Sequence, residues 1–267
     1  MTATTGSMQF LIDTLQSQAP ETVWVILLLF AYASLLVMLR CFGVWGVTIY
    51  MAITLIAANL QVLKTVQFSI WESPVALGTV LFSTTFLCTD ILSEYFSPKD
   101  ARRAVYLGFA GMVLLTAFML LAIGFRPLDP SMRDSPWAWG LENHEHLSAV
   151  FLPIPSILLA GFIAYLCSQI LDIWIYQRIR TLTQSRYRWL RNNVSTWISA
   201  LIDNTIFSIL AWLVFAPEPM QWGVVVHTYI LGTYVLRVAV ALLDTPILYL
   251  AGHCLPRTTA RPTGAVT

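Results

Sequence analysis

Two apolar runs, separated by a short turn, decide the fold. They are TVWVILLLFAYASLLVML at residues 22–39, closed by Arg40, and VWGVTIYMAITLIAANLQVL at residues 44–63, closed by Lys64. A helix rises about 1.5 Å per residue, so each run can cross a hydrocarbon core of about 30 Å. The runs are continuously apolar instead of alternating, which excludes an outer-membrane barrel. The sequence therefore predicts transmembrane helices.

Five further runs of the same kind follow, at about 74–96, 104–125, 150–176, 196–216 and 224–250. The first of them begins at Pro74, and proline is well suited to the first turn of a helix. The whole chain is 57% hydrophobic and only 11% charged, whereas a soluble domain carries about 25% charged residues. We therefore expect an all-α polytopic membrane bundle of about seven transmembrane helices, without a soluble domain.

Basic residues cluster in alternate loops, which predicts the orientation by the positive-inside rule. The basic segments are Arg40, then Lys99 to Arg103, then the arginines between 178 and 191, and finally Arg257 and Arg261. The opposite loops, 126–147 among them, carry mixed or acidic charge. We expect the N-terminus outside and the C-terminus inside, with an extracytoplasmic segment 1–21, one transmembrane domain 22–250 and a cytoplasmic tail 251–267. Residues 1–21 lack Lys, Arg and a long apolar stretch, so we expect no cleaved signal peptide.

Several functional classes lack support in the sequence. A formal net charge of +1 gives no basic field for nucleic acid. The four cysteines form no CxxC pair, and His144 with His146 would supply only two of the ligands that a zinc site needs. No Gly-rich phosphate loop, GxSxG or HExxH pattern appears. We therefore expect a protein that is not an enzyme and that uses no metal and no cofactor.

Ionisable side chains inside the apolar runs mark the candidate site, because each costs about 2.5–3.5 kcal/mol at membrane depth. They are Asp90 and Glu94 in the third run, Asp172 in the fifth, Asp203 in the sixth, and Arg237 with Asp244 in the seventh. The rise per residue places Arg237 near the middle of the membrane, and Asn59 in the outer half of the second run. We expect Asp90, Asp203 and Arg237 to line one shared polar cavity.

Structural roles compete with a binding role for some of these residues. Glu94 and Asp172 lie near the cytoplasmic interface, where they could reach headgroup water. Arg237 could be a counter-ion of Asp203 or Asp90 that permits their burial. Asp90 and Asp203 lie too deep for short side chains to reach water, which makes them the strongest candidates for a function.

Helical spacing places aromatic rings beside these acids. Phe86 shares a face with Asp90, Phe207 shares a face with Asp203, and Tyr165, Gln169, Asp172 and Tyr176 form one stripe on the fifth run. Rings next to carboxylates and amides suit a flat heterocycle, which they would hold by stacking and by hydrogen bonds to its edge.

Five stretches together resemble the vitamin uptake transporter family of queuosine precursor transporters. They are NLQVLK at 59–64, TDILSEYFSPKDARRAV at 89–105, SQILDIWIYQRIR at 168–180, LRNNVSTWISALIDNTIF at 190–207 and LLDTPILYL at 242–250. The resemblance covers about residues 47–250 and implies a six-helix family core, to which the first run adds one N-terminal helix. One departure is Ser97-Pro98, where the family usually has Gly-Lys, so the turn there is expected to be stiffer.

The resemblance implies import of 7-deazapurine precursors of queuosine, such as 7-cyano- or 7-aminomethyl-7-deazaguanine, for tRNA modification. The residues that it carries over by motif are Asn59, Asp90, Glu94, Gln169, Asp172 and Asp203. A carboxylate can accept the adjacent N–H donors of such a base bidentately.

We expect a stand-alone carrier of a purine-like solute in a bacterial inner membrane. One alternative is the substrate-binding membrane subunit of an energy-coupling-factor importer, which borrows separate ATPases. A third reading is a membrane scaffold whose buried charges only specify helix pairing. The sequence leaves open whether the chain forms a homo-oligomer.

Overall fold

The computed structural model describes residues 2–69, 75–152, 154–216 and 218–256. The α-helices are α1 Thr2–Gln16, α2 Pro20–Gln61, α3 Thr79–Tyr95, α4 Pro98–Ile123, α5 Ala138–Phe151, α6 Ile154–Leu182, α7 Arg188–Ile209, α8 Trp222–Val224 and α9 Thr233–Ala251. Two 3-10 segments, η1 Pro130–Asp134 and η4 Gly252–Cys254, and two π-helical segments, η2 Leu210–Val214 and η3 Val225–Gly232, complete the helices. Strands β1 Thr65–Val66 and β2 Val75–Ala76 pair antiparallel, with Thr65 opposite Ala76. The all-α prediction is confirmed.

Among the described residues, five helices are long and apolar enough to cross a membrane. They are Pro20–Gln61, Pro98–Ile123, Leu159–Leu182, Arg188–Val214 and Trp222–Cys254. Large apolar side chains on the outside of these helices, such as Phe30, Trp45 and Phe118, are exposed. Apolar surface on this scale marks contact with lipid or protein. A polytopic membrane bundle is therefore supported.

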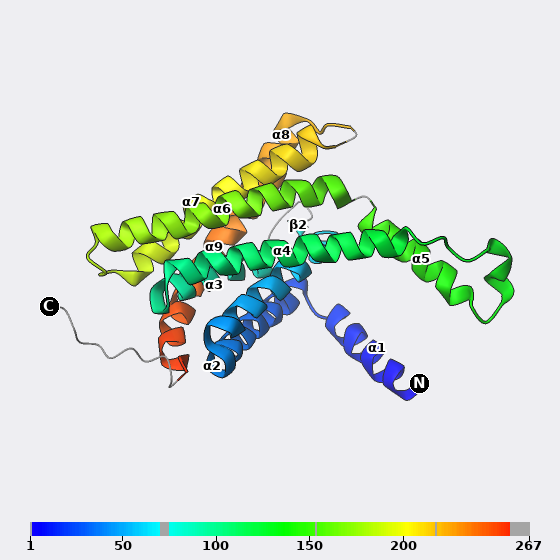
Figure 1. Ribbon diagram of the computed structural model, residues 1–267, viewed down its shortest axis with the longest axis horizontal. Helices are drawn as coiled ribbons and strands as arrows, with labels where there is room; N and C mark the ends of the chain where they lie inside the picture. The colour runs from blue at the N-terminus through cyan, green and yellow to red at the C-terminus, as the bar shows by residue number, and fades with distance from the viewer. Residues whose placement is uncertain (1, 70–74, 153, 217, 257–267) are drawn as a thin grey trace.

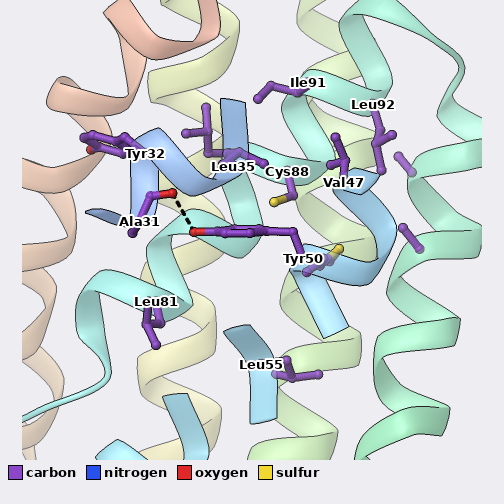
Figure 2. Packing of buried hydrophobic residues seen from close by; sticks show 14 of the residues in the cluster. Ala31, Tyr32, Leu35, Val47, Tyr50, Leu55, Leu81, Cys88, Ile91 and Leu92 are labelled. Atoms are coloured by element: carbon purple, nitrogen blue, oxygen red, sulfur yellow. Dashed lines mark hydrogen bonds between the residues drawn. The ribbon is translucent and has the colours of Figure 1, made fainter. Parts of the chain in front are cut away.

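Helix α2 reverses its direction at Gly43, which has φ 58° and ψ −132°. A side chain is strained at such a positive φ, and glycine adopts it freely. The two arms on either side then pack together: the Tyr50 hydroxyl donates to the carbonyl of Ala31 at 2.8 Å (Figure 2). Around this contact, Leu35, Val47 and other apolar residues form the core between α2, α3 and α4. The first two apolar runs are therefore the two arms of α2.

The segments that connect the helices lie at two opposite ends of the bundle. Helices α1 and α5 project at one end of the long axis, whereas the α3–α4 turn, the α6–α7 turn and the end of α9 lie at the other (Figure 1). The expected loop 126–147 is partly helical, because α5 begins at Ala138 and is rich in good helix formers such as Leu, Glu and Ala. The expected helix start at residue 74 is wrong, because Val75 and Ala76 pair in β2 and α3 begins only at Thr79. Pro74 itself and the tail arginines Arg257 and Arg261 lie outside the described residues.

Candidate functional site

A cavity of about 310 Å³ lies between the second arm of α2 and helices α3, α6, α7 and α9. Its wall includes Asn59, Phe82, Gly161, Tyr165, Asp203, Asn204, Phe207, Trp212, Tyr229, Thr233 and Arg237. Binding sites for small molecules typically enclose about 300–1,000 Å³. The cavity is therefore large enough for a small heterocycle.

Two glycines bring the helices around the cavity close together. Gly78 precedes α3 with φ 99°, and a Cβ there would lie 2.7 Å from the carbonyl oxygen of Ala58. The start of α3 thus rests directly on the end of α2, beside Asn59. A Cβ on Gly161 would lie 3.4 Å from the amide oxygen of Asn59 and 3.9 Å from the ring of Phe207. The missing side chain of Gly161 therefore leaves part of the cavity open.

Asp203 and Arg237 form a buried ion pair in the cavity wall. The guanidinium Nη1 of Arg237 donates to Oδ2 of Asp203, and the Ser168 hydroxyl donates to Oδ1 at 2.9 Å. Asp203 is 9% exposed and Arg237 is 7% exposed. The guanidinium also lies over the ring of Phe82, 5.6 Å from its centroid, in a cation–π contact. Of the two carboxylates considered as partners of Arg237, the structure pairs it with Asp203.

Within the described part of the chain, three buried polar atoms of the wall have no hydrogen-bond partner. They are the Tyr165 hydroxyl, the indole Nε1 of Trp212 and Nε of Arg237. Buried polar groups are almost always paired in native proteins, so three unpaired atoms around one cavity need an explanation. The amide nitrogen of Asn59 donates to the carbonyl of Leu55 at 2.8 Å, which leaves its oxygen beside Gly161. The wall can therefore offer donors and acceptors to a polar ligand.

Aromatic rings form the remainder of the wall. Trp212 on η2 and Tyr229 on η3 lie 4.8 Å apart between ring centroids, tilted by 37°. Sequence reasoning missed both residues, together with Phe82 and Asn204. The two rings lie on π-helical segments, which often occur at functional sites. A π-turn shifts the register by one residue, so α-helical spacing does not reveal that these rings meet.

Asp90, Gln169 and Asp172 lie in a second polar group, outside the cavity. Gln169 donates to the Thr85 hydroxyl at 2.7 Å, and the Thr89 hydroxyl donates to Asp172 at 3.2 Å. The expectation that Asp90 shares the cavity with Asp203 and Arg237 is wrong.

Asp90 lies outside the cavity because of its position along α3. Phe82 lines the cavity, and Asp90 lies eight residues further, which corresponds to about 12 Å along the helix axis.

Glu94 lies near the end of α3, where two arginines from the first turn of α7 bind it. Arg191 binds it at 2.6 Å, Arg188 binds it at 2.9 Å, and the Tyr176 hydroxyl donates to it at 2.9 Å. Its side chain is only 4% exposed, and Asp172 is fully buried. The alternative that these two acids reach headgroup water is therefore wrong, because neighbouring helices enclose them.

Two matching hydrogen bonds join helices α6 and α7. Ser168 of α6 donates to Asp203 of α7, while Ser199 of α7 donates to Asp172 of α6, both at 2.9 Å. Each acid follows the serine of its own helix by four residues, in SQILD at 168–172 and SALID at 199–203. This repeated Ser-x-x-x-Asp spacing is a signal that the sequence analysis did not single out. It links the cavity to the second polar group through one helix pair.

Comparisons with known proteins agree on one family. The family model described as "Putative vitamin uptake transporter" matches residues 76–251, a range that holds every candidate site residue except Asn59. A Bacillus subtilis (strain 168) protein named "Probable queuosine precursor transporter" is 32% identical over 237 residues, which cover 88% of this chain and 96% of that protein.

Two shorter matches carry related names. A Haemophilus influenzae protein named "Probable queuosine precursor transporter" is 25% identical over 51% of each chain. An Escherichia coli (strain K12) protein named "Queuosine precursor transporter" is 29% identical over 51% of this chain and 54% of that protein. No solved structure matches the chain.

Proposed function

The chain belongs to the vitamin uptake transporter family, and on that premise we propose that it imports 7-deazapurine precursors of queuosine across a membrane. The resemblance drawn from its motifs is thereby confirmed at the level of the family. The names of three relatives support the substrate class. The long apolar helices supply the membrane setting that a transporter requires.

The observation that carries the substrate proposal is the composition of the cavity wall. It combines a buried ion pair, unpaired hydrogen-bonding atoms and several aromatic rings around a space that suits a bicyclic base. The free lone pairs of Asp203 accept the N–H groups on the Watson–Crick edge of a deazaguanine. Nε of Arg237 and the indole N–H of Trp212 donate to its carbonyl or nitrile. The ring faces stack against the aromatic wall.

The seven candidate residues then divide into two groups by position. Asn59, Asp203 and Arg237 line the cavity and contact the substrate in our proposal. The four others are Asp90, Glu94, Gln169 and Asp172, which act outside direct contact. Glu94 in particular offers no free acceptor, since two arginines and a tyrosine already bind its oxygens.

We further propose seven spans in a bacterial inner membrane, with the N-terminus outside and the C-terminus inside. The two arms of α2 count as two spans because the chain reverses at Gly43. Helix α3 adds one span, although its 17 residues are short for a membrane crossing. The separation of the connections to two ends supports this arrangement (Figure 1). The basic α6–α7 connection would then face the cytoplasm.

Transport by the purified chain tests the proposal. The protein is reconstituted alone into liposomes, and entry of radiolabelled 7-cyano- and 7-aminomethyl-7-deazaguanine is compared with entry of labelled guanine and with protein-free liposomes. Saturable entry that unlabelled precursor inhibits is expected. Entry that requires added ATPase subunits would favour the energy-coupling alternative instead.

A cellular test addresses the same substrate. In a host that cannot make queuosine precursors, expression of the chain should restore queuosine in tRNA when a precursor is supplied in the medium. A well-expressed chain that neither binds the precursors in detergent nor restores queuosine would overturn the substrate assignment.

A further inference from the structure

Asp90 is a buried acid that nothing in the proposed substrate site explains. It lies on α3 and is 1% exposed, and among the described residues no donor group forms a hydrogen bond to either of its carboxylate oxygens. The charge that acts on it most strongly is that of Asp172 on α6, followed by Asp244 and Glu94. Every charge in this set is negative. An isolated carboxylate in such surroundings is strongly disfavoured.

Asp172, like Asp90, has no positively charged partner among the described residues. It is fully buried, and Ser199 and Thr89 donate to its two oxygens. In the described part of the chain, no Lys or Arg forms an ion pair with Asp90 or Asp172. Two adjoining carboxylates in a dry interior cannot both be ionised, since like charges at short range repel strongly.

Asp203 can be compared with Asp172, because each of these acids accepts a hydrogen bond from a serine of the other helix. Its serine donor is Ser168, as Ser199 is for Asp172. Arg237 neutralises Asp203 with a fixed guanidinium. At Asp172, the place of that cation is taken by a second acid, Asp90. A mobile cation must therefore supply the missing positive charge.

We propose that Asp90 and Asp172 form a proton-binding carboxylate pair that couples import of the substrate to entry of a proton. We assign the mobile cation as a proton because a proton shared by two carboxylates needs no further ligands and no cavity around it. The inference rests on the proposed function, which it deepens by naming the driving force. In each cycle the pair takes up one proton from the outer side and releases it to the cytoplasm, and the substrate moves in the same direction.

The α6–α7 contact connects this pair to the substrate cavity. Asp203 follows Ser199 by four residues on α7, which corresponds to about 6 Å along the axis. A shift of α7 that closes the cavity around a substrate at Asp203 also moves Ser199, which donates to Asp172. The hydrogen-bond donors of the acid pair thus change with occupancy of the cavity.

The other titratable groups around the pair already have partners. They are Tyr176 of α6, which donates to Glu94 of α3; Glu94 itself, which is paired with Arg191 of α7; and Asp244 of α9, which accepts from Tyr32 of α2 at 2.7 Å. Cys88 on α3 faces Asp244 and Tyr50. Of these acids, Asp90 alone receives no hydrogen bond from a donor group of the described residues.

Reconstituted full-length protein tests the proposal through two measurements on the same liposomes. The first is equilibrium exchange of radiolabelled 7-cyano-7-deazaguanine without any gradient, and the second is net accumulation with an acidic outside. One proton per substrate supports accumulation of about tenfold for each pH unit. We expect wild-type protein to show both activities, and a protonophore to abolish the accumulation alone.

Variants then assign the proton to the pair. Asp90→Asn should keep exchange and lose the gradient-driven accumulation, whereas Asp90→Glu, which keeps a carboxyl group, should retain part of it. Asp172→Asn is a second route to the same loss if the first variant folds poorly. Asp100→Asn changes a partly exposed acid in the first turn of α4 and should behave as wild type.

Each contrary outcome has a distinct meaning. Wild-type exchange without accumulation under a pH gradient, or accumulation driven by a sodium gradient alone, would overturn the proton pair. Gradient-driven accumulation by Asp90→Asn at the wild-type level would remove Asp90 from it. Absence of exchange by well-folded wild-type protein would overturn the proposed function itself.

Discussion

Replacing Asp203 by Asn separates the role of this acid in stability from its role in binding. The amide keeps the size of the side chain, and its oxygen can still accept from Ser168. It removes the charge that faces Arg237, which is 7% exposed and has no other carboxylate partner among the described residues. Loss of one partner of a buried ion pair typically costs about 3–5 kcal/mol. We therefore expect a marked loss of thermal stability in addition to any loss of transport.

The double variant Asp203→Asn/Arg237→Gln removes both charges together. Replacement of both members of a buried pair by neutral groups is often close to neutral for folding. We expect the double variant to recover most of the stability that the single variant loses. Substrate affinity should not recover, because the acceptor for the N–H edge of the base is still missing. A lost hydrogen bond to a buried group costs about 1–3 kcal/mol, which corresponds to a Kd about 5- to 150-fold weaker.

The assay measures thermal unfolding in detergent by tryptophan fluorescence and binding of a tritiated precursor to the same samples. Asp203→Glu keeps the charge and serves as the conservative comparison, with partial binding expected. A double variant that binds as tightly as wild type would show that the pair is only structural. A single Asn variant as stable as wild type would show that water compensates Arg237, contrary to its burial.

Three further predictions follow from the geometry. Gly161→Ala should bind and transport nearly as wild type, because its Cβ meets only ordinary contacts at 3.4 Å and 3.9 Å, whereas Gly161→Leu should fill the cavity and abolish binding without loss of expression. Glu94→Gln should lower the free energy of unfolding by about 3–5 kcal/mol, since it leaves the fully buried Arg191 without its carboxylate; a melting temperature equal to that of wild type would contradict this. Ser185→Cys, in a chain whose native cysteines are replaced, should react with an impermeant thiol reagent only after the membrane is permeabilised, and labelling of intact spheroplasts from outside would reverse the proposed orientation.

Apolar patterning was sufficient to predict the helices that dominate the fold. The runs at 22–39 and 44–63 became the two arms of α2, and the short turn between them contains Gly43, where the chain reverses. Burial of Asp90, Asp203 and Arg237 was equally predictable, because short or charged side chains deep in an apolar run must face the protein interior. These features depend on transfer free energies, which act residue by residue and can be read from one sequence.

Contacts between helices were less accessible to sequence reasoning. The position of Asp90 relative to Asp203 depends on how far α3 is displaced along α7, which no pattern within either helix specifies. Trp212 and Tyr229 meet because two π-helical segments change the register of their rings. Helix α5 formed where a loop was expected, since polar residues at the end of a bundle need not be irregular. The sites therefore had to be located by structure.

The two Ser-x-x-x-Asp turns show how one helix pair can serve two ligands. Both acids are buried and both accept from a serine on the opposite helix, so their local scaffolds are equivalent. What differs is the third side chain: a guanidinium faces Asp203, and a carboxyl faces Asp172. A fixed cation leaves a neutral, hydrogen-bonding surface that suits an uncharged heterocycle. An opposing acid leaves a deficit of positive charge that only a mobile cation can fill. Because the serine that donates to each acid lies on the helix that carries the other acid, neither ligand can change its own site without disturbing its neighbour's donor. That mechanical link is the requirement for coupled transport.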